Sequence, residues 1–253
     1  MTGRLTIAGL GPGPAAWMTG AAGEAVASAT DIVGYDTYVR RITSRADQRV
    51  HISDNREELD RSRHALELAT AGRNVVVVSG GDPGVFAMAA AVFEAVEAGP
   101  RSWRTLDIVV EPGVTAMLAA AARLGAPLGH DFCAISLSDN LKPWSVVERR
   151  LQLASEADFV ISLYNPASKA RPGQIHKAFA VLAACRPAVT PVMLARAVGR
   201  PDENITVTTL AKAPNEPIDM RTLVMIGSSA TRILERPNAR PWVYTPRSAE
   251  GVA

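Results

Sequence analysis

Three segments in the first half of the chain combine glycine and proline in a way that leaves the backbone accessible to a ligand. They are Leu5–Pro14 (LTIAGLGPGP), Val75–Gly84 (VVVVSGGDPG) and Ile108–Ala116 (IVVEPGVTA). In each segment an apolar run enters a turn, and an alanine-rich stretch follows. Glycine has no Cβ and adopts positive φ without strain, so a ligand can approach the main chain of such turns closely. The pattern predicts a site for a nucleotide-like cofactor.

The first turn also fits the loose dinucleotide pattern G-x-G-x-x-A over Gly11–Ala16, and Asp36 stands where a ribose-binding acid would follow the second strand. A pyrophosphate at a helix start is held largely by main-chain N–H groups. Pro12 and Pro14 have no N–H to donate, and they stiffen the loop. The turn therefore favours a rigid wall of a ligand site, or a plain strand-to-helix connection, over a dinucleotide site.

The later turns each allow a structural and a functional interpretation. In Ser79–Gly84, Asp82 followed by proline fits a helix N-cap, but a cap does not require the three glycines around it. Thr115 in the third turn fits a cap equally well. Near residue 165, Tyr164 is either a core residue or a ligand contact, and Asn165 is a typical turn former. The sequence leaves both interpretations open at each position.

The ionisable residues form no motif for hydrolysis. The sequence has no G-x-S-x-G, no HExxH and no paired Cys/His spacing, and its four histidines are isolated, so no metal site is predicted. Seven arginines and five acids between residues 40 and 63 form either a solvated helical face or a rim for a polycarboxylate substrate. Without a nucleophile–base pair, the chemistry favoured is group transfer from an activated cofactor, where orientation alone supplies ~7–11 kcal/mol.

An alternation of apolar strands and helices must position these turns in the first half. The predicted strands are Leu5–Leu10, Asp31–Tyr35, Val50–Ile52, Asn74–Ser79 and Leu106–Glu111. The predicted helices are Gly20–Ala29, Glu57–Ala71, Val85–Ala98 and Thr115–Leu124. This order predicts an α/β domain with a mainly parallel sheet and flanking helices, and ligands bind at the carboxyl ends of such strands.

The alternation pauses at the Gly/Pro-rich segment Gly125–His130, which predicts a boundary between domains 1–126 and 127–253. The strands expected beyond it are Cys133–Leu137, Asp158–Leu163, Val192–Ala195, Ile205–Thr209 and Thr222–Ile226. The helices expected there are Ser145–Ser155 and Gly173–Ala184. The last strands are short and rich in threonine, so the second domain is expected to hold a mixed sheet. The Pro-rich tail, Arg236–Arg247, is expected to be irregular.

Composition sets limits on the class of protein. The 253 residues are 47% hydrophobic and 5% aromatic, which is enough apolar material for sizeable α/β cores. The 27 basic and 25 acidic side chains leave a net charge of +2, so a dedicated nucleic-acid binder is not expected. Two scattered cysteines, Cys133 and Cys185, form no disulfide framework. With no signal peptide or membrane span expected, the prediction is a cytoplasmic protein.

Taken together and in order, the turns resemble those of the tetrapyrrole methylases. The marks of that family are a GxGPG turn after the first strand, a GGDP loop and a PGVTA segment, which stand here at Gly9–Gly13, Gly80–Pro83 and Pro112–Ala116. Four more segments narrow the resemblance to the branch that methylates precorrin-3B at carbon 17. They are GYDTY at 34–38, GHDF at 129–132, SLSDNLKPW at 136–144 and LYNP at 163–166.

The resemblance implies a two-domain α/β enzyme that binds S-adenosylmethionine in the cleft between its domains. The implied cofactor contacts are Pro12, Gly80, Gly81, Asp82, Val85, Thr115, Ala116, Tyr164, Asn165, Arg196, Ala197, Val198 and Gly227. The implied reaction methylates carbon 17 of the macrocycle in cobalamin biosynthesis. Ring contraction accompanies it, extrudes carbon 20 as an acetyl group and yields precorrin-4. By the same resemblance a homodimer is expected.

The family supplies no firm catalytic acid or base. Five residues in the branch-specific segments are the candidates: Asp36, Tyr38, His130, Ser138 and Asp139. The sequence departs from its relatives at Pro14-Ala15, where many carry an acid, and at Ala197-Val198, where Asn-Ala is common after the arginine. The alternatives are the cobalt-precorrin-3 version of the step in the oxygen-independent route, a relative acting on ribosomal RNA or diphthamide, a nicotinamide-dependent dehydrogenase, and a non-catalytic tetrapyrrole carrier.

Overall fold

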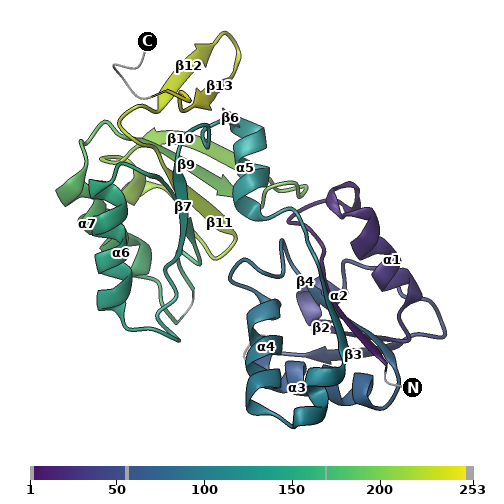
Figure 1. Cartoon of the computed structure of the whole chain (residues 1–253). Helices are drawn as coiled ribbons and strands as arrows, with labels where there is room; N and C mark the ends of the chain where they lie inside the picture. The colour runs from purple at the N-terminus through teal and green to yellow at the C-terminus, as the bar shows by residue number, and fades with distance from the viewer. Residues whose placement is uncertain (1–2, 55–56, 169, 249–253) are drawn as a thin grey trace. The chain divides into compact units, whose positions relative to one another are not determined.

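The computed structural model describes residues 3–54, 57–168 and 170–248. The chain divides into two compact units, Met1–Thr115 and Ala116–Ala253 (Figure 1). The sequence predicts the boundary after residue 126, whereas the units divide after Thr115. The reason is that helix α5 (Ala116–Leu124) packs against strands β6, β11 and β13 of the second unit.

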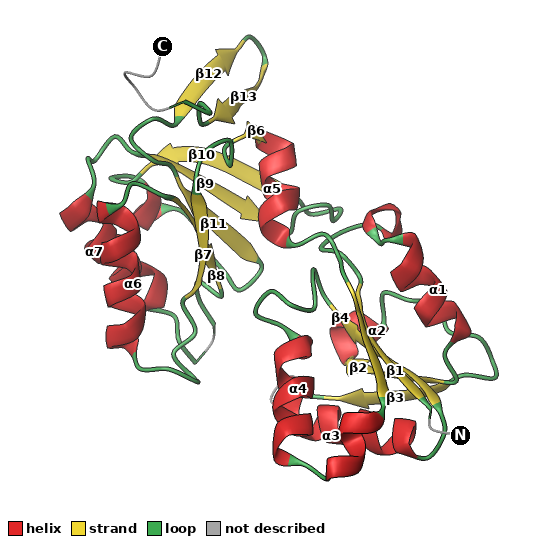
Figure 2. Cartoon of the chain, viewed as in Figure 1, coloured by secondary structure: helices red, strands yellow, loops and turns green. Residues whose placement is uncertain are grey.

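The first unit is a parallel sheet with helices on both faces, as the strand–helix alternation predicts (Figure 2). Its strands, in spatial order, are β3 (Arg49–Ser53), β2 (Asp31–Tyr35), β4 (Asn74–Ser79), β1 (Arg4–Gly9) and β5 (Asp107–Glu111). Its helices are η1 (Ala15–Trp17), α1 (Gly20–Ser28), α2 (Asp36–Val39), α3 (Glu58–Thr70), α4 (Met88–Ala98) and η2 (Arg101–Thr105).

The valine run of β4 shows why this sheet is covered on both faces. Val75 and Val77 are fully buried against α3 and α4, whereas Val76 and Val78 are fully buried in the cluster that contains α1. Successive side chains of a strand point to opposite faces, so four consecutive valines require a hydrophobic layer on each side.

The second unit contains the mixed sheet that the sequence predicts. In spatial order its strands are β10 (Asn204–Thr209), β9 (Pro191–Arg196), β11 (Thr222–Ile226), β8 (Val160–Tyr164) and β7 (Phe132–Ser136). Strand β11 runs antiparallel to β8 and β9, so those two are parallel to each other and to β7. One face is covered by α6 (Trp144–Glu156) and α7 (Gln174–Cys185), with η3 (Ala213–Asn215) beside them.

The prediction of an irregular C-terminal tail is wrong. Strands β12 (Arg232–Arg236) and β13 (Ala239–Tyr244) form an antiparallel hairpin, and β13 pairs in parallel with the short β6 (Gly125–Ala126). The turn places Asn238 at φ 57°, a conformation that asparagine tolerates. Pro237 and Pro241 lie within this hairpin and are typical of loops, so they hide the strand pattern. One of the two strands that pair with β13, the short β6, also lies more than a hundred residues earlier in the chain.

The helix predicted from Val85 begins later, at Met88. Phe86 has φ 52° and Ala87 is extended, so neither residue continues a helix. Asp82 therefore does not cap α4, contrary to the structural interpretation of the second turn. The segment between β4 and α4 is instead a longer loop with a turn at Asp82–Val85.

Candidate active site

The three glycine turns of the first unit meet at one edge of its sheet. Gly9 at the end of β1 is in register with Ser79 at the end of β4, and Ala8 is in register with Glu111 at the end of β5. The N–H of Gly11 donates to the carbonyl of Gly81 at 3.1 Å, and the N–H of Gly81 donates to Gly11 at 3.0 Å. The first two turns are thus joined by a short antiparallel bridge.

The third turn packs closely against the main chain of the other two. A Cβ added to Gly113 would lie 2.2 Å from the carbonyl oxygen of Gly81 and 3.0 Å from the Cα of Gly9. No side chain fits there, so glycine is required at position 113. Thr19, the N-cap of α1, also donates to the carbonyl of Pro112 at 3.2 Å. Some of the glycines therefore serve close packing of the turns, which the sequence alone does not separate from ligand approach.

Asp82 connects the second turn to the third. One carboxylate oxygen accepts from the N–H of Gly84 at 2.8 Å, and the other accepts from the N–H of Gly113 at 3.0 Å. Both oxygens are thus engaged by main-chain donors. The structure assigns Asp82 the role of holding two turns together at this edge.

Two catalytic candidates lie at the same edge of the first unit, just after β2. The ring of Tyr38 covers Gly80, where an added Cβ would lie 2.4 Å from the ring. Both carboxylate oxygens of Asp36 accept from Nε of Arg40, each at 2.8 Å. Position 80 therefore requires glycine, because the ring of Tyr38 occupies the space that a side chain would need.

The first turn is rigid, and its backbone is further fixed by Arg41. This guanidinium donates to the carbonyls of Leu10 and Gly13, at 3.0 Å each. The helix α1 begins only at Gly20, well after the turn. A pyrophosphate on this turn would therefore not meet the start of α1, which agrees with the case against a dinucleotide site.

The arginine-rich segment has mixed roles. Arg61 is buried, donates to Ser53 at 2.8 Å and also donates to the carbonyl of Asp54, and burial lowers its pKa. Three other arginines of the segment form exposed ion pairs, which are Arg40–Asp36, Arg45–Asp47 and Arg63–Asp60. Arg56 lies outside the described residues. The segment is thus neither a uniform solvated face nor an open rim of free guanidinium groups.

In the second unit, the ends of β7 and β8 form a second polar edge. The hydroxyl of Tyr164 accepts from the N–H of Met117, in the first turn of α5, at 3.0 Å. Asn165 has φ 54° and donates from its side chain to Ser136 at 2.9 Å. Tyr164 therefore accepts a hydrogen bond at the start of α5 and is also a candidate cofactor contact. Asn165 occupies the left-handed turn position that its residue type predicts.

The branch-specific segment after β7 adds charged groups to this edge. Asp139 accepts from Gln174 at 3.1 Å and from Arg171 at 3.5 Å. The hydrogen bond from Gln174, with a smaller contribution from Arg171, holds the pKa of Asp139 below its ordinary value, so this carboxylate is ionised and a weak base. Lys142 donates to the carbonyl of Ser138 at 3.0 Å, and burial lowers the pKa of this lysine. Sequence reasoning missed Lys142 and Arg171, although Lys142 lies inside the quoted segment.

The end of β9 lies at the same edge, since β9 runs parallel to β8. The guanidinium of Arg196 is held by Asp219 at 2.8 Å and by Asp202 at 3.1 Å. Ala197, at φ 52°, and Val198 are buried. Any ligand at this strand end would therefore meet main-chain atoms of these two residues rather than their side chains.

Two predicted site residues lie away from this edge. Gly227 follows β11, which runs antiparallel, so Gly227 lies beside the start of β9 and donates to Pro191 at 2.8 Å. His130 precedes β7 and lies at the opposite end of that strand from Ser138. Its neighbour Gly129 packs on the main chain of Thr245. Strand direction therefore separates Gly227 and His130 from the candidates at this edge, and the cofactor-binding role of Gly227 and the catalytic role of His130 stay predictions.

Residues 4–214 match the model of the family described as tetrapyrrole (corrin/porphyrin) methylases. The chain belongs to this family. The resemblance to this family, predicted from the three turns, is thereby confirmed, and so is the predicted α/β fold class.

The most similar relatives and structures agree with that assignment. The chain is 58% identical over 253 residues, the full length of both proteins, to a precorrin-3B C(17)-methyltransferase of Sinorhizobium sp. It is 44% identical to a probable cobalt-factor III C(17)-methyltransferase of Salmonella typhimurium, with 95% of this chain and 99% of that one covered. The crystal structure of the methyltransferase CobJ superposes with a TM-score of 0.91 at 52% identity, covering 96% of this chain and 100% of that one.

Proposed function

We propose that this chain transfers the methyl group of S-adenosylmethionine to carbon 17 of precorrin-3B, in cobalamin biosynthesis. Ring contraction accompanies the transfer, extrudes carbon 20 as an acetyl group and gives precorrin-4. The observation that carries the proposal is full-length similarity at 58% identity to a precorrin-3B C(17)-methyltransferase, in a chain whose three glycine turns are packed at one strand edge.

The cofactor is proposed to bind the strand edges mainly through main-chain groups. The proposed contacts are Pro12, Gly80, Gly81, Asp82, Val85 and Thr115 in the first unit, and Ala116, Tyr164, Asn165, Arg196, Ala197 and Val198 in the second. A sulfonium carries an activated methyl group, so alignment of donor and acceptor supplies most of the rate. Hydrogen bonds between Gly11 and Gly81 and from Gly113 to Asp82 join the three turns. They support this role because they hold the carbonyl and N–H groups of the turns in fixed positions.

The substrate is proposed to contact the branch-specific segments. Asp36, Tyr38, Ser138 and Asp139 remain the candidates for contact with the macrocycle. Lys142 and Arg171 add positive charge at the second edge, which suits the carboxylate side chains of a tetrapyrrole. Because Asp139 is kept ionised, we propose that it orients these cations instead of taking a proton.

A second candidate substrate is the cobalt-containing equivalent. The 44% identity to a probable cobalt-factor III C(17)-methyltransferase over nearly the full chain favours keeping it. Turnover should be measured with metal-free precorrin-3B and with cobalt-factor III, each with S-adenosylmethionine. Faster turnover of precorrin-3B supports the proposal; turnover of the cobalt compound alone would replace it, and turnover of neither would refute both.

Calorimetry tests the cofactor separately. The chain is expected to bind S-adenosylhomocysteine and not NADH, whereas the reverse result would favour a dehydrogenase. A homodimer in the cytoplasm is also proposed from the family resemblance. Among the described residues, no helix is long and apolar enough to cross a membrane.

A further inference from the structure

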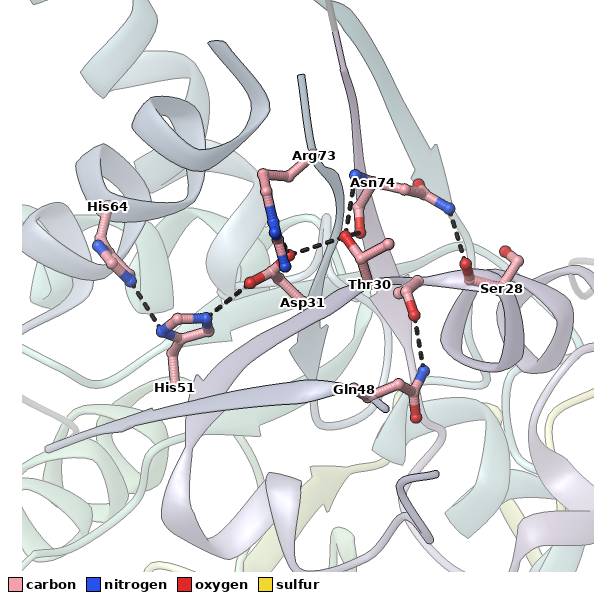
Figure 3. Close-up of polar contacts among 9 residues, drawn as sticks. Ser28, Thr30, Asp31, Gln48, His51, His64, Arg73 and Asn74 are labelled. Carbon is pink, nitrogen blue, oxygen red and sulfur yellow. Dashed lines mark hydrogen bonds and ion pairs between the residues drawn. The ribbon is translucent and has the colours of Figure 1, made fainter. Parts of the chain in front are cut away.

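In the first unit, a chain of polar side chains leads from the start of β2 through the middle of β3 to α3 (Figure 3). Nε2 of His51 lies 2.9 Å from Oδ1 of Asp31, and Nδ1 of His51 lies 3.1 Å from Nε2 of His64. Asp31 is the first residue of β2, His51 is on β3 and His64 is on α3. The proposed methyl transfer uses none of these residues.

Asp31 is fixed in position before any ligand arrives. Its side chain is fully buried, and its carboxylate accepts from Nε of Arg73 at 2.5 Å and from Thr30 at 2.7 Å. The Arg73 guanidinium pairs with this carboxylate, which is therefore the charged acceptor of an ion pair. The ionised carboxylate only accepts, so Nε2 of His51 must carry a proton.

When the ring of His51 is neutral, its lone pair is therefore on Nδ1, the nitrogen that faces His64. In that tautomer Nδ1 of His51 accepts from Nε2–H of His64. A carboxylate that holds one nitrogen of a histidine whose other nitrogen faces a metal is the common outer arrangement of metal sites. It orients the ring and makes the coordinating nitrogen more basic.

The two facing nitrogens have the separation that a metal ion requires. Zn–N distances are ~2.0–2.1 Å, so two nitrogens in neighbouring coordination positions lie about 3 Å apart. The observed separation of 3.1 Å matches this value. Binding needs only that the proton on Nε2 of neutral His64 moves to Nδ1, so no oxidant or further reactant is involved.

We propose that Nδ1 of His51 and Nε2 of His64 bind one divalent transition-metal ion of the zinc, nickel and copper class, with Asp31 as the outer carboxylate. Imidazole nitrogens suit these metals. In the part of the chain that the structure describes, no group of three or more His, Cys, Asp or Glu forms a metal cluster, so water fills the remaining positions. His64 is exposed, which gives the ion access from solvent.

The charges around the pair are compatible with a bound cation. Arg73 is already paired with Asp31. Arg63, which neighbours His64 in sequence, is exposed and paired with Asp60 at 2.8 Å. Neither guanidinium therefore leaves an uncompensated positive charge at the two nitrogens.

The test is a titration of the full chain with NiCl₂ and with ZnCl₂, on a Cys185→Ser background because that cysteine is an exposed free thiol. We expect one equivalent to bind, and His64→Gln to weaken binding by about tenfold or more. The matched control is His176→Gln, on the exposed face of α7 in the other unit, which should bind like the parent. Nitrogen-15 signals of His51 and His64 should shift, and those of His176 should not.

A second variant tests the outer carboxylate. Asp31→Asn should weaken binding by ~10–100-fold, in a chain shown by circular dichroism to be folded. The proposal is overturned if no ion binds at ~1 mM, or if His64→Gln binds as tightly as the control. Binding of S-adenosylhomocysteine should be unchanged in all variants, so the outcome is independent of the proposed methyl transfer.

Discussion

Asp82 is the side chain that joins two of the three glycine turns. Each of its carboxylate oxygens accepts from one main-chain N–H, of Gly84 and of Gly113. In Asp82→Asn one oxygen becomes an NH₂ group that faces a donor. We expect a loss of about 1–3 kcal/mol in the free energy of unfolding, measured with urea.

The same substitution should weaken S-adenosylhomocysteine binding about tenfold by calorimetry, equivalent to ~1.4 kcal/mol. The control is Asp47→Asn, which removes an exposed pair with Arg45 and should change both quantities little. Unchanged stability and affinity in Asp82→Asn would contradict the role assigned to this residue.

Asp202 gives a pH-dependent prediction at the same scale. The hydrogen bond from Arg221 is the largest cause, with Arg196 assisting, and the pKa of Asp202 is lowered to about 2. Between that value and the ordinary ~3.9, the unfolded chain binds more protons than the folded one. The contribution of Asp202 to stability is therefore present above pH ~4 and is lost as the pH falls toward 2.

The measurement is the urea midpoint of the parent and of Asp202→Asn across this pH range. The parent should be the more stable at pH 5, and the difference should shrink by pH 2. The effect should be small and reduced by salt, because the pair is exposed. A difference that grows on acidification would contradict the assignment.

At the scale of elements, two glycines predict opposite results on replacement. A Cβ on Gly23, within α1, would meet only Cε of Met18 at 3.6 Å, so Gly23→Ala should stabilise the chain by up to ~1 kcal/mol. A Cβ on Gly113 would overlap Gly81, so Gly113→Ala should destabilise it by ~1–3 kcal/mol. Thermal unfolding of both variants checks the pair; similar effects of both would show that the turns are not packed as described.

Strands were easier to predict from the sequence than the turns between them. Asp31–Tyr35, Asn74–Ser79 and Thr222–Ile226 are predicted to the residue, because each is an apolar run with clear ends. The hairpin of β12 and β13 was missed because Pro237 and Pro241 are typical of loops, and the pairing of β13 with β6 is long-range. The late start of α4 depends on the left-handed backbone of Phe86, which its residue type does not indicate.

At the scale of the whole molecule, the order of the three turn motifs along the chain was enough to predict the family. The direction of each strand then determines which site residues lie together. The turns at Gly80–Pro83 and Pro112–Ala116 are short in sequence and meet in the structure because their strands are parallel neighbours of β1. Gly227 could not be placed from sequence, since the direction of β11 depends on how the sheet pairs. The His51–His64 contact was also missed, because it depends on how helix α3 packs beside strand β3.

Methyl transfer to the macrocycle is the claim on which the proposed function depends. The most direct test incubates the chain with precorrin-3B and S-adenosylmethionine carrying a carbon-13 methyl group, and locates the label by NMR and mass spectrometry. The account predicts a product of the mass of precorrin-4, with the label on the methyl group of carbon 17 and an unlabelled acetyl group. A label at any other position, or no label in the product, would contradict it.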